Sequence, residues 1–181
     1  MLHAGVPETL LDEVMKILGP RLLRRFESQE GYKCFPETLR LLKELRKSNV
    51  KISAVSNSDP RILKTLSSLQ ILPLLTHPPT LSYYTNCSKP DPEMYRIACA
   101  SCDEIPGEGV LMVGDELEAD YNGSLKASLE PRLITRVGSY SAHTERSLLG
   151  DIEGKEVIDN LWDIVQEGVE VLRVENVTAK C

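Results

Sequence analysis

The amino-acid sequence predicts an α/β protein with a parallel sheet between helices. Short apolar stretches alternate along the chain with longer segments that have the leucine spacing of amphipathic helices. Small polar turns follow two of the apolar stretches, and ligands bind at such strand ends in open parallel sheets. The 181 residues, of which 41% are hydrophobic, are enough for one domain with a core of ordinary size.

The N-terminal third predicts helix, strand and helix in turn. Residues 1–30 have helical periodicity that Gly19-Pro20 interrupts, which predicts two short helices. Residues 36–49 begin with a proline and space their leucines along one face, so they predict a helix. The apolar residues 50–56 predict a short strand, and a helix over 61–70 follows an Asp-Pro pair that suits a helix start.

The rest of the chain continues the alternation. Residues 71–88 contain three prolines and predict a loop, with a short strand near 74–76. The apolar run 109–115 predicts a strand buried on both faces, as is typical of parallel sheets. The remaining segments predict a helix from about Glu93, a helix over 117–127, a strand over 131–137 and an amphipathic helix over 157–174.

Charge and composition exclude several classes of function. The 27 acidic and 21 basic residues give a net charge of −6, so the sequence favours a cationic cofactor and predicts no nucleic acid or membrane partner. No apolar stretch reaches 18 residues, and the N-terminus lacks the pattern of a secretory signal. With five cysteines, an odd number, these features predict a protein of the cytoplasm or nucleus.

Residues with phosphate and metal chemistry follow the predicted strands. Clustered carboxylates repel one another unless a cation lies between them, and the stretch GVLMVGDELEAD ends in four of them. Together with the hydroxyl and amide groups at 56–58 and Lys89 in a loop, Asp115 and Asp120 predict a pocket for phosphate and Mg²⁺. The alternatives are a helix-capping Ser56, a solvated Lys89 and an acidic helix start without metal.

Three motifs in order carry a resemblance to a known family. FPETLRLLKELRKSNVKISAVSNSDPR, SKPDPEMY and LMVGDELEADYNGSLKA resemble the second, third and fourth motifs of the haloacid dehalogenase-like (HAD) hydrolase superfamily. Within it they resemble most the group of haloacid dehalogenase-like hydrolase domain-containing protein 3. The resemblance covers residues 31–137 and a closing helix at 159–172, and it implies a Rossmann-type parallel sheet between helices.

The resemblance implies a role for each candidate residue. Ser56 would hydrogen-bond a phosphoryl oxygen, and Asn57 would flank the substrate. Lys89 would act in catalysis by neutralising the nucleophile and the phosphoryl group. Asp115 and Asp120, in the pattern Gly-Asp-x-x-x-x-Asp, would hold Mg²⁺. The implied activity is Mg²⁺-dependent hydrolysis of phosphate esters, with a small phosphorylated metabolite as substrate.

The sequence departs from the family at its first motif. The family nucleophile belongs to an Asp-x-Asp pair after the first strand, and no Asp-x-Asp occurs in the 181 residues. We therefore expect an incomplete fold that lacks the nucleophile strand, between the strands ending at Ser56 and Asp115, and most of the helical cap. Residues 1–30 would be a cap remnant, and residues 31–181 the core.

Three functions remain open at this point. The chain is expected to be an inactive or truncated relative of Mg²⁺-dependent phosphatases. The second possibility is a non-catalytic binding protein that uses the pocket, or apolar cap helices left exposed, to bind a protein partner. The third is an active phosphohydrolase whose nucleophile lies outside the family pattern.

Overall fold

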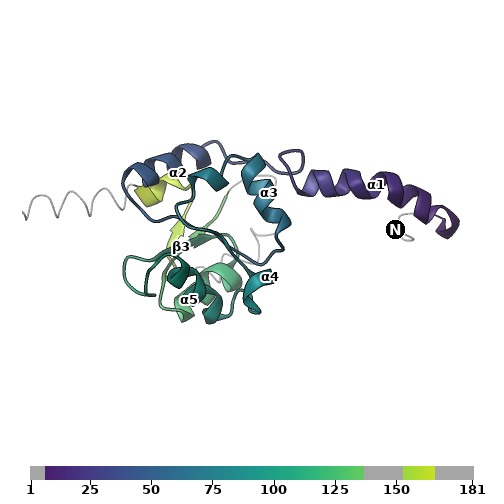
Figure 1. Ribbon diagram of the computed structural model, residues 1–181. Coiled ribbons are helices and arrows are strands. Elements are labelled where there is room, and N and C mark those ends of the chain that lie inside the picture. Colours follow the sequence, from purple (N-terminus) through teal and green to yellow (C-terminus); the bar gives the residue numbers. More distant parts are fainter. Residues whose placement is uncertain (1–6, 137–152, 166–181) are drawn as a thin grey trace, which may run out of the picture.

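The computed structural model describes residues 7–136 and 153–165 (Figure 1). Figure 1 places α2 and α3 on one side of the molecule and α5 on the other, with β3 between them. The elements in chain order are η2 (Glu8–Leu10), α1 (Leu11–Phe26), α2 (Thr38–Lys47), β1 (Val55–Ser56), α3 (Arg61–Ser68), η3 (Leu72–Leu74), β2 (Thr80–Leu81), α4 (Ser82–Thr85), α5 (Pro92–Ser101), β3 (Leu111–Gly114), η4 (Leu117–Asn122), α6 (Gly123–Lys126), β4 (Glu130–Ile134) and β5 (Val157–Ile158). The α/β fold with parallel strands predicted from the sequence is confirmed.

Helix α1 corrects the prediction of two short N-terminal helices. It runs unbroken from Leu11 to Phe26 with Pro20 inside it. Because proline has no N–H, Pro20 cannot donate a hydrogen bond to the carbonyl of Lys16, four residues earlier. Lys16 is exposed, so water can donate to this carbonyl instead. Figure 1 shows α1 projecting from the rest of the molecule, which leaves room for the helix to accommodate the proline ring.

The C-terminal end of α1 is fastened to α3. The Thr65 hydroxyl, on a residue only 1% exposed, donates a hydrogen bond of 2.9 Å to the backbone carbonyl of Phe26. Lys64 Nζ lies 2.9 Å from Glu27 Oε2. These contacts lie at one end of α1, so most of the helix extends beyond them.

The strands form two sheets rather than one. β1 pairs with β2, and β3, β4 and β5 form a second sheet in that order; every pair is parallel. Within the described ranges no strand joins β1 to β3. The strand that the sequence predicts to be missing between β1 and β3 stays a prediction.

The edge position of β3 corrects the prediction of a strand buried on both faces. Leu111 is 36% exposed, and the three residues after it are half-buried. β4, which has a neighbour on each side, alternates instead between half-buried and buried residues and holds Leu133 at 1% exposure. β3 is more exposed because only one of its two edges is paired in the part of the chain that the structure describes.

Two other strand predictions need correction. The strand expected at 74–76 is β2, at Thr80–Leu81, because the Thr80 N–H donates to the Ala54 carbonyl at 2.8 Å and so sets the register with β1. Val157 and Ile158, placed in a helix by the sequence, form β5 beside β4, since β-branched residues suit the pleated surface. The predicted helix beyond residue 165, and the strand end at 137, lie outside the described residues.

Helix α5 supplies the centre of the core. Met94 and Tyr95 are 0% exposed, and Tyr95 packs with Cys99, Ala127 and Leu129. Cys99 and Cys102 are free, buried thiols, and burial raises the pKa of Cys99. None of the helices in the described segments is long and apolar enough to cross a membrane.

An ion pair joins the start of α2 to the end of β4, and it gives a pH-dependent prediction. Arg136 Nη1 lies 2.6 Å from Glu37 Oε1, and its guanidinium lies 3.6 Å from the centre of the Phe35 ring. Burial alone would raise the pKa of Glu37, but hydrogen bonds from its own backbone and from Arg136 outweigh burial and lower it. The pair therefore stabilises the fold above the ordinary pKa of a glutamate, about 4.3, and this stabilisation is lost as the pH falls through the lowered value.

Glu37→Gln is expected to lower the free energy of unfolding by about 1 kcal/mol at pH 7. The deficit should shrink as the pH falls below about 4.3, where the glutamate of the unfolded chain takes up a proton, and it should vanish once the pH is below the lowered pKa of Glu37 in the folded protein. Urea unfolding of both proteins at several pH values measures this. A deficit that stays constant down to pH 3 would show that packing, rather than charge, accounts for it.

Candidate functional site

Three loops meet at Lys89: the turn after β1, the segment before α5 and the turn after β3. The side chain of Asn57, directly after β1, is hydrogen-bonded to both the carbonyl and the N–H of Lys89. Its amide Nδ2 donates to the Lys89 carbonyl at 2.9 Å, and its Oδ1 accepts from the Lys89 N–H at 2.8 Å. This paired contact spans 32 residues of sequence and fixes the position of the lysine relative to the end of β1.

The Lys89 side chain reaches the segment that follows β3. Its Nζ lies 2.5 Å from Asp120 Oδ1, with side-chain exposures of 12% for the lysine and 5% for the aspartate. A buried ion pair of this kind is held only where both charges find partners. Lys89 is therefore not a solvated loop lysine. Through its contacts with Asn57 and Asp120 it links the turn after β1 to the segment after β3.

Gly114 and the Glu116 backbone hold the Asp120 carboxylate in place. The N–H of Glu116 donates to Asp120 Oδ2 at 3.0 Å. A Cβ atom at position 114 would lie 2.2 Å from Asp120 Cγ, so only glycine leaves room for the carboxylate there. The glycine before Asp115 therefore has a packing role that the motif alone does not explain.

Asp120 lies in η4, a π-helix over Leu117–Asn122. Both the Asp120 and the Tyr121 N–H groups donate to the Glu116 carbonyl, at 2.7 and 3.3 Å. Single π-turns are rare and occur frequently at functional sites. The sequence predicts helix here, which is confirmed, but its leucine spacing gives no sign of the wider turn.

The other candidate residues lie at the same ends of the sheets. Ser56 is the last residue of β1 and is half-buried beside Leu81 of β2. Asp115 follows β3 and is exposed, and among the described residues its carboxylate has no hydrogen bond or ion pair. The structure thus joins Asn57, Lys89 and Asp120 directly, whereas Ser56 and Asp115 lie next to members of this group in sequence.

The donor set accommodates a magnesium ion only in part. Mg²⁺ is usually held by one or two carboxylates, with waters or phosphate oxygens as its other ligands. Among the residues that the structure describes, the Asp115 carboxylate has no partner, while both oxygens of Asp120 are engaged by Lys89 and Glu116. Among the described residues no three His, Cys, Asp or Glu side chains converge as a metal-binding cluster. Asp115 is thus suited to be the first ligand, and Asp120 could be the second, because each of its oxygens keeps a further lone pair beside its bond to Lys89 or Glu116.

Glu118 forms an ion pair with Lys126 and has no contact with Lys89 among the described residues. Its Oε1 lies 2.9 Å from Lys126 Nζ, and its Oε2 accepts a hydrogen bond from Asn122 at 2.8 Å. The hydrogen bonds from Asn122 and Lys126 lower the pKa of Glu118. This carboxylate is therefore engaged along η4 and α6, away from Lys89.

Tyr95 at the site was not found from the sequence. It looks like one more apolar residue of α5, but it donates its hydroxyl hydrogen bond to the Ala119 carbonyl in η4. A tyrosine in a helix is common, so it gave no signal that sequence reasoning could use. Ser58 belongs to the predicted group at 56–58, and its hydroxyl is buried with no hydrogen-bond partner among the described residues.

The amino-acid sequence is similar to that of a curated yeast protein. A protein of Saccharomyces cerevisiae, the uncharacterized protein YMR130W, is 27% identical over 149 residues, which are 75% of this chain and 47% of the yeast protein. The chain thus spans about half the length of this curated relative.

Solved structures share the fold. The crystal structure of a HAD phosphatase from Thermococcus onnurineus is 22% identical, with a TM-score of 0.54 over 68% of this chain and 60% of the other. The HAD-hydrolase YfnB from Bacillus subtilis, solved with bound magnesium, is 18% identical, with a TM-score of 0.59 over 73% of this chain and 53% of the other.

A protein-family model that matches most of the sequence identifies the family. Residues 2–127 match the haloacid dehalogenase-like hydrolase family, a span that contains Ser56, Lys89 and Asp120. The parallel strands and the linked turns at their ends agree with that match. The chain therefore belongs to the haloacid dehalogenase-like hydrolase family.

Proposed function

We propose that this chain carries the phosphate- and magnesium-binding part of a HAD phosphohydrolase site and that its 181 residues do not hydrolyse phosphate esters. The observation that carries the proposal is the placement of Lys89, held by Asn57 on one side and Asp120 on the other. The sequence supplies this cation but no Asp-x-Asp pair to attack a phosphoryl group.

Each residue has one role in the proposal. The Ser56 hydroxyl and the Asn57 side chain would contact the phosphate, and the Lys89 ammonium would neutralise its oxygens. Asp115, with Asp120, would hold Mg²⁺, which when bound stabilises charge on phosphoryl oxygens. The magnesium bound to the Bacillus subtilis relative supports the choice of ion. Lysine and carboxylates suit a small phosphorylated metabolite better than a haloacid.

We further propose that the first-motif strand of the family belongs between β1 and β3. The division into two sheets and the exposure of β3 support this. The chain would then represent part of a longer phosphatase of the cytoplasm or nucleus, near the group of haloacid dehalogenase-like hydrolase domain-containing protein 3. Residues 1–30 would be a cap remnant and residues 31–181 the core.

A phosphatase assay tests the absence of turnover. With a panel of phosphate esters and Mg²⁺, we expect no hydrolysis above the buffer rate, because removing a covalent nucleophile costs many orders of magnitude. Asp115→Asn should then behave like the wild type. Hydrolysis that Asp115→Asn abolishes would contradict the proposal and reveal a nucleophile outside the family pattern.

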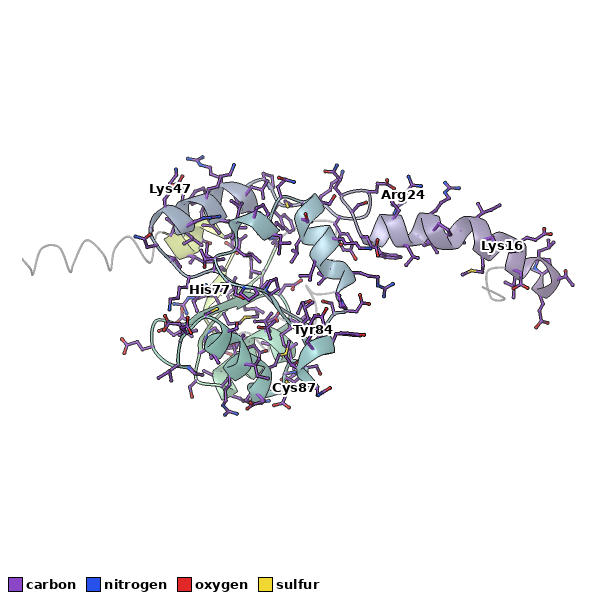
Figure 2. All side chains as sticks on the ribbon, in the orientation of Figure 1. Lys16, Arg24, Lys47, His77, Tyr84 and Cys87 are labelled. Atoms are coloured by element: carbon purple, nitrogen blue, oxygen red, sulfur yellow. The ribbon has the colours of Figure 1, made fainter. Side chains whose placement is uncertain are left out.

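A specific observation favours a second function, binding of a protein partner through α1. Most of this helix is uncovered, and Figure 2 shows it with Lys16 and Arg24 labelled along the projecting part. A hollow of about 410 Å³ near its C-terminal end is lined by Leu18, Leu22, Glu30 and three arginines. The exposed apolar side chains of η2 and α1 are Leu10, Met15, Ile17, Leu22, Leu23 and Phe26. A partner that binds the wild-type chain but not Ile17→Glu, in the absence of turnover, would favour this function.

A further inference from the structure

Tyr95 lies where the three parts of the candidate site meet. It belongs to α5, is 0% exposed, and donates its hydroxyl hydrogen bond to the Ala119 carbonyl of η4. A Cβ atom at Gly123 would lie 2.7 Å from the Tyr95 hydroxyl oxygen and 2.9 Å from Pro90 Cα. The hydroxyl is therefore packed between η4, α6 and the turn that carries Lys89.

The Ala119 carbonyl and the Asp120 N–H belong to one planar peptide group. Tyr95 binds the oxygen of this group, and the Glu116 carbonyl accepts the hydrogen bond from its N–H at 2.7 Å. A peptide plane held at both ends cannot rotate without breaking a hydrogen bond, and its rotation would swing the Asp120 side chain away from Lys89. Both ends of this plane are thus fixed by residues of the site.

We infer that Tyr95 is a positioning residue, which fixes the Ala119–Asp120 peptide group and so aims the Asp120 carboxylate at Lys89. The inference rests on the proposed role of Lys89 and Asp120 in binding phosphate and metal. Burial, together with the carboxylates of Asp120, Glu116 and Glu118, raises the pKa of Tyr95, so the phenol remains a protonated donor. Simple core packing would need only the ring, which phenylalanine supplies equally well.

Tyr95→Phe tests the inference by removing the hydroxyl and keeping the ring. Amide hydrogen exchange should become about ten-fold faster at Asp120 and Tyr121, which is the loss expected from one hydrogen bond. Exchange in β4 should not change. The NMR signal of the Lys89 ammonium, protected while the ion pair is closed, should weaken or disappear.

Two further variants complete the test. Tyr84→Phe is the matched control, because Tyr84 is 63% exposed and should leave all these signals unchanged. Gly123→Ala keeps the phenol but crowds both its oxygen and the Pro90 backbone, so it should speed exchange at the same amides and weaken the Lys89 signal, which gives a second reading if Tyr95→Phe folds poorly. Unchanged exchange at Asp120 and an unchanged Lys89 signal in Tyr95→Phe, or acceleration equal throughout β4, would overturn the inference. No turnover is measured, so these outcomes are distinct from failure of the proposed function.

Discussion

Lys89→Met is expected to lower the free energy of unfolding by about 3 kcal/mol, since it leaves a buried carboxylate without its counter-charge. Asp120 is the partner, with a side chain 5% exposed, and water cannot easily replace the lysine there. The methionine keeps most of the apolar stem of the lysine, so the loss reports chiefly on charge. Urea unfolding with a linear extrapolation measures it.

The chain offers a matched control for this prediction. Lys126 pairs with Glu118 at 2.9 Å, but the two side chains are 57% and 62% exposed. Lys126→Met should therefore cost less than about 0.5 kcal/mol. Adding Asp120→Asn to Lys89→Met should recover part of the loss, because the buried charge is then removed. Equal losses for Lys89→Met and Lys126→Met would contradict the buried pair.

Gly114→Ala is the second substitution with a large expected effect. The added Cβ would lie 2.2 Å from Asp120 Cγ, far inside van der Waals contact, so β3 or the carboxylate must move. The cost of such overpacking is about 3 kcal/mol, and moving Asp120 also weakens its contacts with Lys89 and the Glu116 N–H. Urea unfolding measures the loss, and the Lys89 ammonium signal reports the ion pair.

Gly107→Ala is the control for this substitution. No atom lies within 4 Å of a Cβ at position 107, so this change should alter the stability by less than about 0.5 kcal/mol. A Gly114→Ala protein as stable as Gly107→Ala would mean that the Asp120 carboxylate does not lie against the backbone of β3. It would also remove the physical reason for glycine before Asp115.

Sequence reasoning succeeded where local patterns decide the structure. The proline pair and the apolar spacing after Lys89 predicted α5 within one residue of its start, and the motif pattern indicated that Lys89 and Asp120 belong to one site. The prediction that Pro20 would break the N-terminal helix was wrong, because α1 projects from the molecule and a helix with exposed carbonyls tolerates a proline that a packed helix would not.

The remaining features depend on contacts between distant parts of the chain. Asn57 and Lys89 are 32 residues apart, and Tyr95 and Ala119 are 24 apart, so no local pattern records either contact. The burial of β3 was predicted wrongly because an apolar run shows that a strand suits a core and does not show whether both its edges are paired. The sequence therefore predicted which turns carry the candidate residues, whereas the contacts that hold these residues together required the structure.

The most direct test of the central claim is one NMR titration with a phosphate monoester and Mg²⁺, in which the protein amides and the phosphorus signal are followed in the same sample. A site that retains binding without a nucleophile predicts shifts at Ser56, Asn57, Lys89 and Asp115, while the phosphorus signal of the ester stays intact for days. Consumption of the ester, or an absence of shifts at these four residues, would contradict the claim.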